Sequence, residues 1–315
     1  MSPRPYPQLL RGERHRWWRS LLSLSVVVGG LALLLVVSTI GLFVASIAGG
    51  VDLEGMQAEL DEPWVLLSTN LLLAYCIPLS MLAVWAGHGW RPRWVASVAG
   101  GLRWRWMLAC AVVSLVVAVA GTAFFWVLDG GPSGVGRDVA VLLLIVALTT
   151  PLQAAGEEYL FRGWMSQAVG ALFARAAVGA VVAAAFSAGV FALAHGGQNA
   201  FLFVDRFAFG LLASYLVWRT GGLEAAIAAH TVNNVVVFVP VILTGGLAAA
   251  IGVSEASPGL VAFDVVSMVL LGAALTWLAR RAGVQRLFVE PRGPDDGNGG
   301  TLLAPPTASG SIHPR

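Results

Sequence analysis

The stretch LLLIVALTTPLQAAGEEYLFRG, residues 142–163, decides the class of fold. It begins as an apolar run of the kind that crosses a bilayer, for which a helix needs about 20 residues. Near its end it carries two adjacent carboxylates, Glu157 and Glu158, and the guanidinium of Arg162. On insertion scales, an ionisable group inside a span costs roughly 2.5–3.5 kcal/mol. The stretch therefore predicts a membrane helix whose charged residues serve a structural or functional purpose.

The composition of the whole chain agrees with a membrane protein. Of its 315 residues, 57% are hydrophobic and 11% are charged, whereas soluble domains carry about 25% charged residues. Inside lipid, helices of this length satisfy all of their own backbone groups. We therefore predict an all-α, polytopic membrane helix bundle of about eight transmembrane helices. The predicted spans are 21–48, 64–87, 106–128, 138–160, 176–195, 200–218, 222–244 and 259–279.

The loop charges predict the orientation of the chain. All 19 basic residues are arginines, and they gather before the first span, after the second and after the eighth. By the positive-inside rule, both termini lie in the cytoplasm of a multi-pass cell-membrane protein. Since the arginines flank apolar runs, we expect the lipid bilayer, and no nucleic acid, as their partner. The first loop is acidic instead and holds Asp52, Glu54, Glu59, Asp61 and Glu62.

Composition also divides the chain into four parts. Residues 1–20 form a cytoplasmic basic N-terminal segment, and 21–135 hold the first three membrane helices. The apolar run after residue 20 is too long for the core of a signal peptide, so we interpret it as a retained helix. A transmembrane core follows at 136–282, and 283–315 form a cytoplasmic tail. The tail is rich in Pro and Gly, and we predict that it is disordered.

Helical spacing separates the charged residues of the fourth span. Glu158 and Arg162 are four residues apart with the acid first, which is the favourable order for an ion pair. Glu157 lies about 100° around the helix and misses that partner. We therefore predict that Glu158 is neutralised by Arg162, while Glu157 faces another group.

Two further pairs of polar or aromatic residues show the same spacing. Phe191 precedes His195 by one turn, and His230 precedes Asn234 by one turn, so each pair shares a helix face. A water molecule between Glu157 and His195 could lose a proton and attack a peptide carbonyl. His230 and the Asn234 amide could then donate hydrogen bonds to the oxyanion. The alternative is that these residues have structural roles only. Glu157 would then pair with Arg162, and His195 would hydrogen-bond free carbonyls at the end of its helix. His230 and Asn234 would form hydrogen bonds between helices.

Together, these motifs resemble the CPBP family over residues 142–238. This family comprises type II CAAX prenyl endopeptidases and bacterial abortive-infection and bacteriocin-processing relatives. The resemblance implies an intramembrane endopeptidase, of glutamate type or metal-dependent, that cleaves a membrane-associated peptide or protein such as a CAAX-like, lipidated or leader peptide. The implied catalytic residues are Glu157, His195, His230 and Asn234, supported by Glu158, Arg162 and Phe191.

The cofactor is left open by this resemblance. No cofactor is assigned, but a zinc ion would find ligands in Glu157, His195 and His230. Two other functions are retained as alternatives. One is a non-catalytic bacteriocin-immunity or peptide-binding membrane protein, and the other is a proton-coupled transporter.

Further residues remain outside the catalytic hypothesis. We interpret Asp205 and Arg206 as a helix–helix pair, with substrate contact as the rival interpretation, and expect Asp264 to point inward. Residues 131–134, Gly-Pro-Ser-Gly, are expected to form a turn. The substrate cavity is expected to open toward the cytoplasm. Residue counting, however, places His195 toward the far side of the membrane.

Overall fold

The computed structural model describes residues 3–12, 15–49, 62–130 and 133–289. Within these ranges, eight helices are long and apolar enough to cross a membrane, which confirms the predicted polytopic helical fold. The spans are α1 (Trp17–Ile47), α2 with α3 (Pro63–Ala74 and Cys76–His88), α4 (Trp104–Asp129), α5 with its continuation (Val139–Glu158), α7 (Ala176–Ala194), α8 (Ala200–Thr220), α9 (Glu224–Thr244) and α11 (Pro258–Arg281). The shorter elements are β1 (Arg4–Pro5), η1 (Tyr6–Gln8), η3 (Pro92–Val95), η4 (Tyr159–Met165), α6 (Ser166–Gly170), α10 (Leu247–Ile251) and β2 (Leu287–Phe288).

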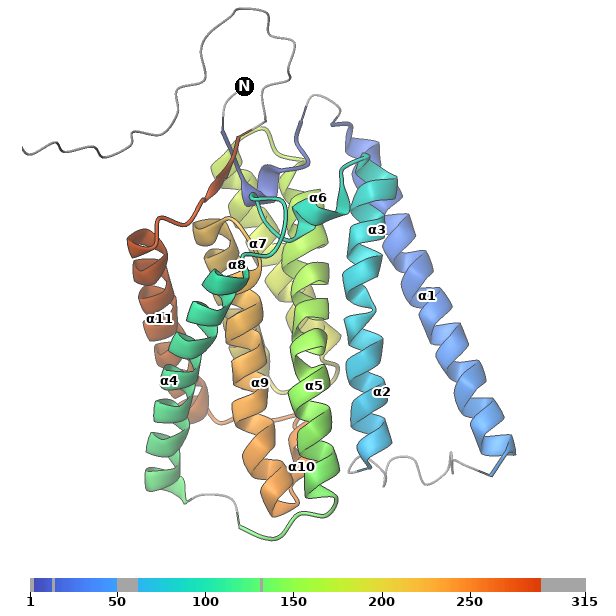
Figure 1. Cartoon of the computed structure of the whole chain (residues 1–315), viewed down its shortest axis with the longest axis vertical. Coiled ribbons are helices and arrows are strands. Elements are labelled where there is room, and N and C mark those ends of the chain that lie inside the picture. The colour runs from blue at the N-terminus through green and yellow to red at the C-terminus, as the bar shows by residue number, and fades with distance from the viewer. Residues whose placement is uncertain (1–2, 13–14, 50–61, 131–132, 290–315) are drawn as a thin grey trace, which may run out of the picture.

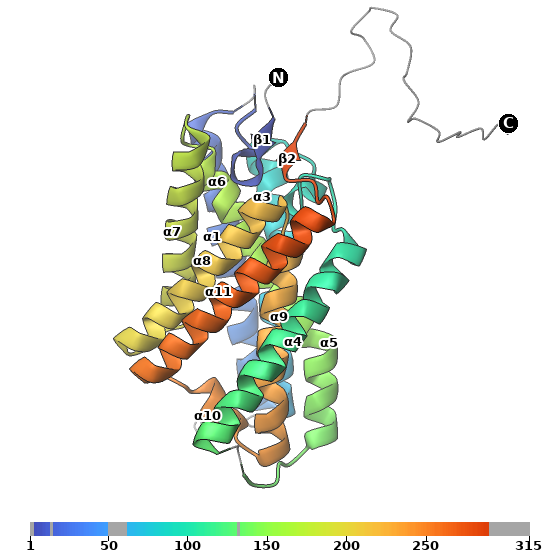
Figure 2. The same cartoon turned by 90° about the vertical axis from the view of Figure 1, so that its left-hand side faces the viewer.

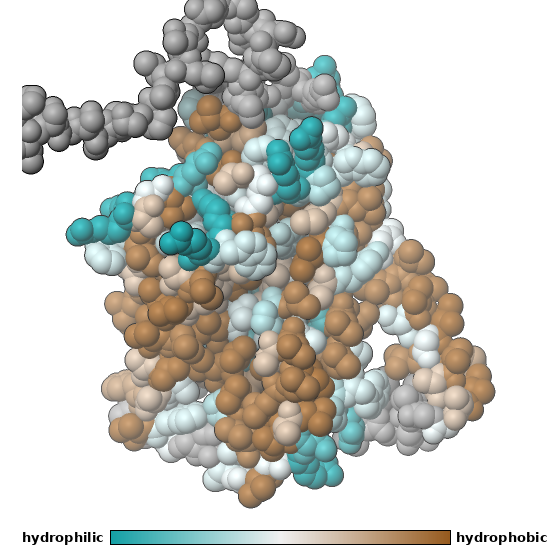
Figure 3. All heavy atoms as spheres, in the orientation of Figure 1, coloured by the Kyte–Doolittle hydropathy of each residue, from teal (hydrophilic) through white to brown (hydrophobic). Residues whose placement is uncertain are grey.

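The helix α9 lies at the centre of the bundle. It packs against α4 on one side and α5 on the other, while α2 covers the far side of α5 (Figure 1). The helices α7, α8 and α11 lie side by side on another face (Figure 2). Brown, apolar side chains cover most of the visible helix surface in Figure 3. Such a surface suits contact with lipid, and the chain is a multi-pass membrane protein.

The fourth span is longer than predicted. We expected it to end near residue 160, but the helix continues from Val139 through η4 and α6 to Gly170. Arg162 does not end it because the Arg162 side chain is fully buried and paired with Glu158. The segment η4 is a π-helical turn, a feature that is frequent at functional sites. Glu157 consequently lies near the middle of a 32-residue helix.

The second span is interrupted between α2 and α3. Tyr75 separates them, and Pro78 follows three residues later, where it has no N–H to donate to the Ala74 carbonyl. Gly156 of α5 approaches this interruption so closely that a Cβ atom there would lie 2.0 Å from the Leu73 carbonyl oxygen. Glycine is therefore required at the position that directly precedes Glu157.

Both ends of the described chain meet at the arginine-rich end of the bundle. The strands β1 and β2 pair antiparallel, with Arg4 opposite Phe288. Tyr6 and Leu9 are fully buried, so the basic N-terminal segment packs onto the core. Phe288 is 3% exposed and belongs to β2, so the described part of the predicted tail, residues 283–289, contains a buried strand residue. The strand forms because Phe288 can bury its ring against Trp90 and Trp94.

Some predicted features lie outside the described residues. They are the acids of the first loop before Glu62, the first two residues of the Gly-Pro-Ser-Gly turn, and the tail from residue 290 onward.

Candidate active site

His230 lies between the two glutamates of α5. Its Nδ1–H donates to Oε1 of Glu158 over 2.8 Å, and its Nε2 lies 3.3 Å from Oε2 of Glu157. The imidazole is buried, at 4% exposure. A carboxylate at each ring nitrogen fixes the orientation of the ring and offers an acceptor to a proton on either nitrogen. Sequence spacing did not predict that one imidazole would contact both acids.

The neighbouring ion pair agrees with the prediction from spacing. Nη1 of Arg162 donates to Oε1 of Glu158 over 3.1 Å, and both side chains are fully buried. The guanidinium also lies over the ring of Phe191, 4.3 Å from its centroid. Glu158 thus receives hydrogen bonds from Arg162 and His230 at the same oxygen, whereas Glu157 contacts His230 alone among the ion pairs of the described residues.

His195 ends α7 close to the same site. Its Nδ1–H donates to the Phe191 carbonyl over 2.8 Å, which leaves Nε2 as the nitrogen that can accept a proton. The Phe191 ring contacts His195 edge-on at 4.7 Å and His230 at 6.0 Å between centroids. The Phe191 ring therefore packs against both histidine rings, and we call it the aromatic wall.

The longer fourth helix reduces the conflict over the depth of His195. From Gly170 to Glu157 the helix descends about 20 Å, and from Ala176 to His195 it descends about 28 Å, at about 1.5 Å per residue. Counting from a helix that ended near residue 160 placed Glu157 much nearer the arginine-rich end. The two residues are thus nearer in depth than that counting implied; Glu157 is buried, whereas His195, directly after α7, is exposed.

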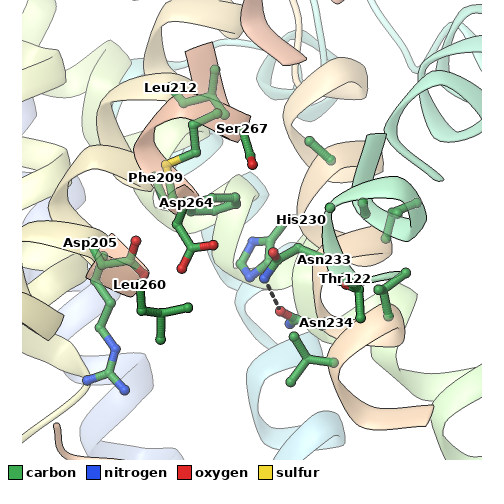
Figure 4. A pocket seen from close by; sticks show the side chains of 18 of the residues that line it. Thr122, Asp205, Phe209, Leu212, His230, Asn233, Asn234, Leu260, Asp264 and Ser267 are labelled. Carbon is green, nitrogen blue, oxygen red and sulfur yellow. Dashed lines mark hydrogen bonds between the residues drawn. The ribbon is translucent and has the colours of Figure 1, made fainter. Parts of the chain in front are cut away.

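Asn234 has a partner that sequence reasoning missed. Its Nδ2 donates to Oε1 of Gln153 over 3.0 Å, and Asn233 donates to Oδ1 of Asn234 over 3.5 Å (Figure 4). Gln153 lies on α5, four residues before Glu157 and hence on the same helix face. An amide at that spacing in an apolar run was the signal that could have identified it.

A cavity of about 540 Å³ borders this group of residues. His195, His230 and Asn234 line it, together with residues of α4, α8 and α11. Figure 4 shows the amides of Asn233 and Asn234 on one side of the cavity and Asp205 and Asp264 on the other. A peptide segment of a few residues has about the volume that such a cavity offers.

We expected the cavity to open toward the arginine-rich end, but its lining extends toward the opposite end of the bundle. Its lining includes Val253 and Glu255, which precede α11, whereas Arg280 and Arg281 lie at the other end of that helix. Asp205 and Asp264 lie in the halves of α8 and α11 that are opposite to the ends carrying Arg219 and Arg280. The cavity therefore extends toward the end of the bundle that carries few basic residues.

The described side chains do not fit the suggested zinc site. Among them, no group of three or more His, Cys, Asp or Glu residues is arranged to hold a metal ion. Both ring nitrogens of His230 face carboxylates, and Nδ1 of His195 is bonded to a backbone carbonyl. Glu157, His195 and His230 are thus neighbours without forming a set of three ligands around one point.

Comparison with family models identifies this region. Residues 137–236 match the model described as type II CAAX prenyl endopeptidase Rce1-like. This segment is an Rce1-like CAAX protease domain. The predicted resemblance is confirmed, and the domain contains all three motifs on α5, α7 and α9. Comparison of the chain with curated proteins and with solved structures gives no match.

The Rce1-like domain does not enclose the cavity by itself. Its helices α8 and α9 form two walls, while α4 and α11, which lie outside residues 137–236, form the others. Helices beyond the domain therefore shape the space next to His230.

Proposed function

We propose that the chain is an intramembrane endopeptidase that hydrolyses a peptide bond in a membrane-associated peptide or protein. One observation carries this proposal. The buried His230 contacts Glu157 and Glu158 from a position beside a cavity that His195 and Asn234 also line. Inside a membrane, five such polar groups in one region are costly, and a catalytic site is a sufficient reason for that cost.

In the proposed reaction, Glu157 acts as the general base. A water molecule between Glu157 and His195 gives a proton to the carboxylate, and its oxygen attacks the peptide carbonyl carbon. His230, with a proton on each ring nitrogen, donates from Nε2 to the oxyanion of the tetrahedral intermediate, and the Asn234 amide donates a second hydrogen bond. The proton then passes from Glu157 to the departing amine as the C–N bond breaks. The products are a carboxylic acid and an amine.

Glu158 and Arg162 are supporting residues in this scheme. Because Arg162 offsets the charge of Glu158, that carboxylate can accept the Nδ1–H of His230 throughout the cycle. The remaining nitrogen of His230 is then directed toward Glu157 and the reacting oxygen. Gln153 holds Asn234 in a comparable way.

Purified protein in detergent, incubated with a peptide library, tests the proposal. We expect cleavage by the wild type and a loss of at least a hundredfold in Glu157→Gln, which keeps the shape of the side chain and removes the base. Asp138→Asn makes the same kind of substitution outside the cavity and should cleave normally. Equal cleavage by the wild type and Glu157→Gln would exclude this base.

The same experiment separates the alternatives. A peptide-binding or immunity protein would retain peptides without cleaving them. A proton-coupled transporter would acidify liposomes in response to a substrate gradient, and its Glu157→Gln variant would lose that response. Neither behaviour is expected of a protease that only hydrolyses peptides.

We also propose that both termini face the cytoplasm. The support is the arginine-rich end at which Arg4 and Phe288 meet. The substitutions Arg91→Cys and Ser254→Cys each place a cysteine at an exposed position, at opposite ends of the bundle. The native Cys76 and Cys110 are buried. In intact cells, an impermeant maleimide should label Ser254→Cys and spare Arg91→Cys. The reverse result would invert the orientation.

A further inference from the structure

Two acidic side chains line the cavity opposite the catalytic amides. Asp205 comes from α8 and Asp264 from α11 (Figure 4). When both are charged, the two carboxylates repel each other. Oδ1 of Asp205 is buried and has no hydrogen-bond partner among the described residues. The proposed reaction uses neither residue, although carboxylates at such a depth in a membrane bundle call for a cationic partner.

The neighbouring cation, Arg206, interacts electrostatically with Asp205 but forms its hydrogen bonds with other residues. Asp205 and Arg206 are interpreted from the sequence as a helix–helix pair, with substrate contact as the rival. Nη1 of Arg206 donates to Oε1 of Gln198, in the loop after α7, over 2.7 Å. Its Nη2 donates to the Val253 carbonyl over 3.4 Å. Arg206 thus connects the loops after α7 and α10, and no hydrogen bond joins it to Asp205 within the described chain. Glu255 adds a third acid to the lining.

A second polar group in the lining also lacks a partner. Ser114 of α4 is 1% exposed, and its hydroxyl makes no hydrogen bond with any described residue. Around it the lining is apolar and includes Phe209, Phe263 and Met268. A buried hydroxyl without a partner is costly, so a ligand that brings a hydrogen-bonding group into the cavity would relieve that cost.

We propose that Asp205 and Asp264 form a subsite for a basic side chain of the substrate, a Lys or Arg next to apolar residues. The apolar lining takes the neighbouring side chains, and the Ser114 hydroxyl donates to a backbone carbonyl of the bound peptide. This inference rests on the proposed function, since it names the class of peptide that the protease cleaves. It predicts that the cavity prefers peptides with a Lys or Arg side chain, which the motif residues alone do not explain.

Peptide binding to the Glu157→Gln protein in detergent tests the subsite without cleavage. Two fluorescent apolar peptides that differ only in Lys or norleucine at one position, moved through the sequence in turn, serve as probes. We expect the Lys peptide to bind about tenfold more tightly at one position, the size of effect that close charge pairs produce. Equal affinity for the two peptides at every position overturns the proposal.

Two variants test whether Asp205 and Asp264 cause the preference for the Lys peptide. Asp205→Asn and Asp264→Asn, each added to Glu157→Gln, should bring the Lys peptide close to the affinity of the norleucine peptide. Asp138→Asn removes one carboxylate outside the cavity and should leave the tenfold ratio intact; Asp138 has φ of 50°, which Asn tolerates. If the preference for the Lys peptide persists in both variants, Asp205 and Asp264 do not cause it and the proposal is wrong. If one variant fails to fold, the other and the peptide pair still decide.

Cleavage by the wild type distinguishes the two proposals. If both peptides are cleaved at equal rates and bound equally, the subsite is wrong and the protease assignment stands. If the Lys peptide binds more tightly but neither peptide is cleaved, the subsite stands and the protease assignment fails.

Discussion

Nδ1 of His230 donates a hydrogen bond of 2.8 Å to Oε1 of Glu158, although the two residues lie on different helices. The same oxygen accepts from Arg162 at 3.1 Å. This single buried oxygen therefore couples the orientation of His230 to an ion pair on α5. The charge balance of the pair therefore affects both the stability of the fold and the proposed catalytic role of His230.

The first prediction concerns this buried ion pair. Arg162→Met leaves the Glu158 carboxylate buried without its cation, which should lower stability by about 3 kcal/mol. Adding Glu158→Gln removes the unpaired charge and should recover much of the loss, because replacing both partners of a buried pair is often nearly neutral. Thermal unfolding in detergent, followed by tryptophan fluorescence, measures both. A double variant less stable than Arg162→Met would contradict this account.

A second prediction concerns the helix crossing at Gly156. Ala at this position would place its Cβ 2.0 Å from the Leu73 carbonyl oxygen, so the backbones must separate. We expect destabilisation by about 2 kcal/mol, as for other overpacked cores. Gly189→Ala is the matched control, since nothing lies within 4 Å of its added Cβ.

The two alanine variants should differ in sign. Removing a helical glycine without a clash stabilises by about 0.5–1 kcal/mol, so Gly189→Ala should melt at or above the wild-type temperature. Gly156→Ala should melt below it and should also lose peptidase activity, because Glu157 follows directly. Equal melting temperatures would show that the two helices separate at no cost.

Sequence reasoning predicted the fold because membrane spans depend on local composition. The eight apolar runs, the Glu158–Arg162 pair and the shared face of His230 and Asn234 all follow from short-range spacing. The end of the fourth helix did not follow, since a buried Arg162 looks in sequence like an arginine at an interface. Its position depends on a partner one turn away and on packing by α7 and α8.

The contacts between helices that are distant in sequence could not be predicted from spacing either. Which acid meets His230 depends on the rotation of α9 against α5, and α5 carries Pro151 and continues into a π-helical turn, both of which alter the regular 100° step. Gln153 was overlooked for the same reason, because its importance lies in reaching Asn234. Local periodicity identifies faces of helices but does not specify their mutual register.

The third prediction tests Gln153 as a positioning residue. Gln153→Leu removes the acceptor of the Asn234 amide and should lower kcat about tenfold with little change in KM, since oxyanion contacts act in the transition state. Gln153→Glu keeps an acceptor at the same place and should restore a large part of the rate. A purely structural role would change the melting temperature in both variants without this rescue.

The fourth prediction addresses the aromatic wall. Phe191→Leu keeps an apolar side chain but removes the ring that both histidines contact. We expect kcat to fall by about tenfold or more, because small displacements of catalytic groups are costly. Phe203→Leu is the control, since Phe203 stacks with Phe207 and does not line the cavity. Equal rates in the two variants would argue that the histidines hold their places unaided.

The pairing of β1 with β2 has a mechanical consequence. Arg4 and Phe288 form the outermost pair of a two-residue antiparallel ladder, and the chain leaves both strands on the same side. A force that pulls the two ends apart therefore opens the ladder like a zipper, one pair after the other, before it reaches any helix. The two-residue ladder is thus the first to bear tension, and the bundle that holds His230 is loaded only after the ladder has opened.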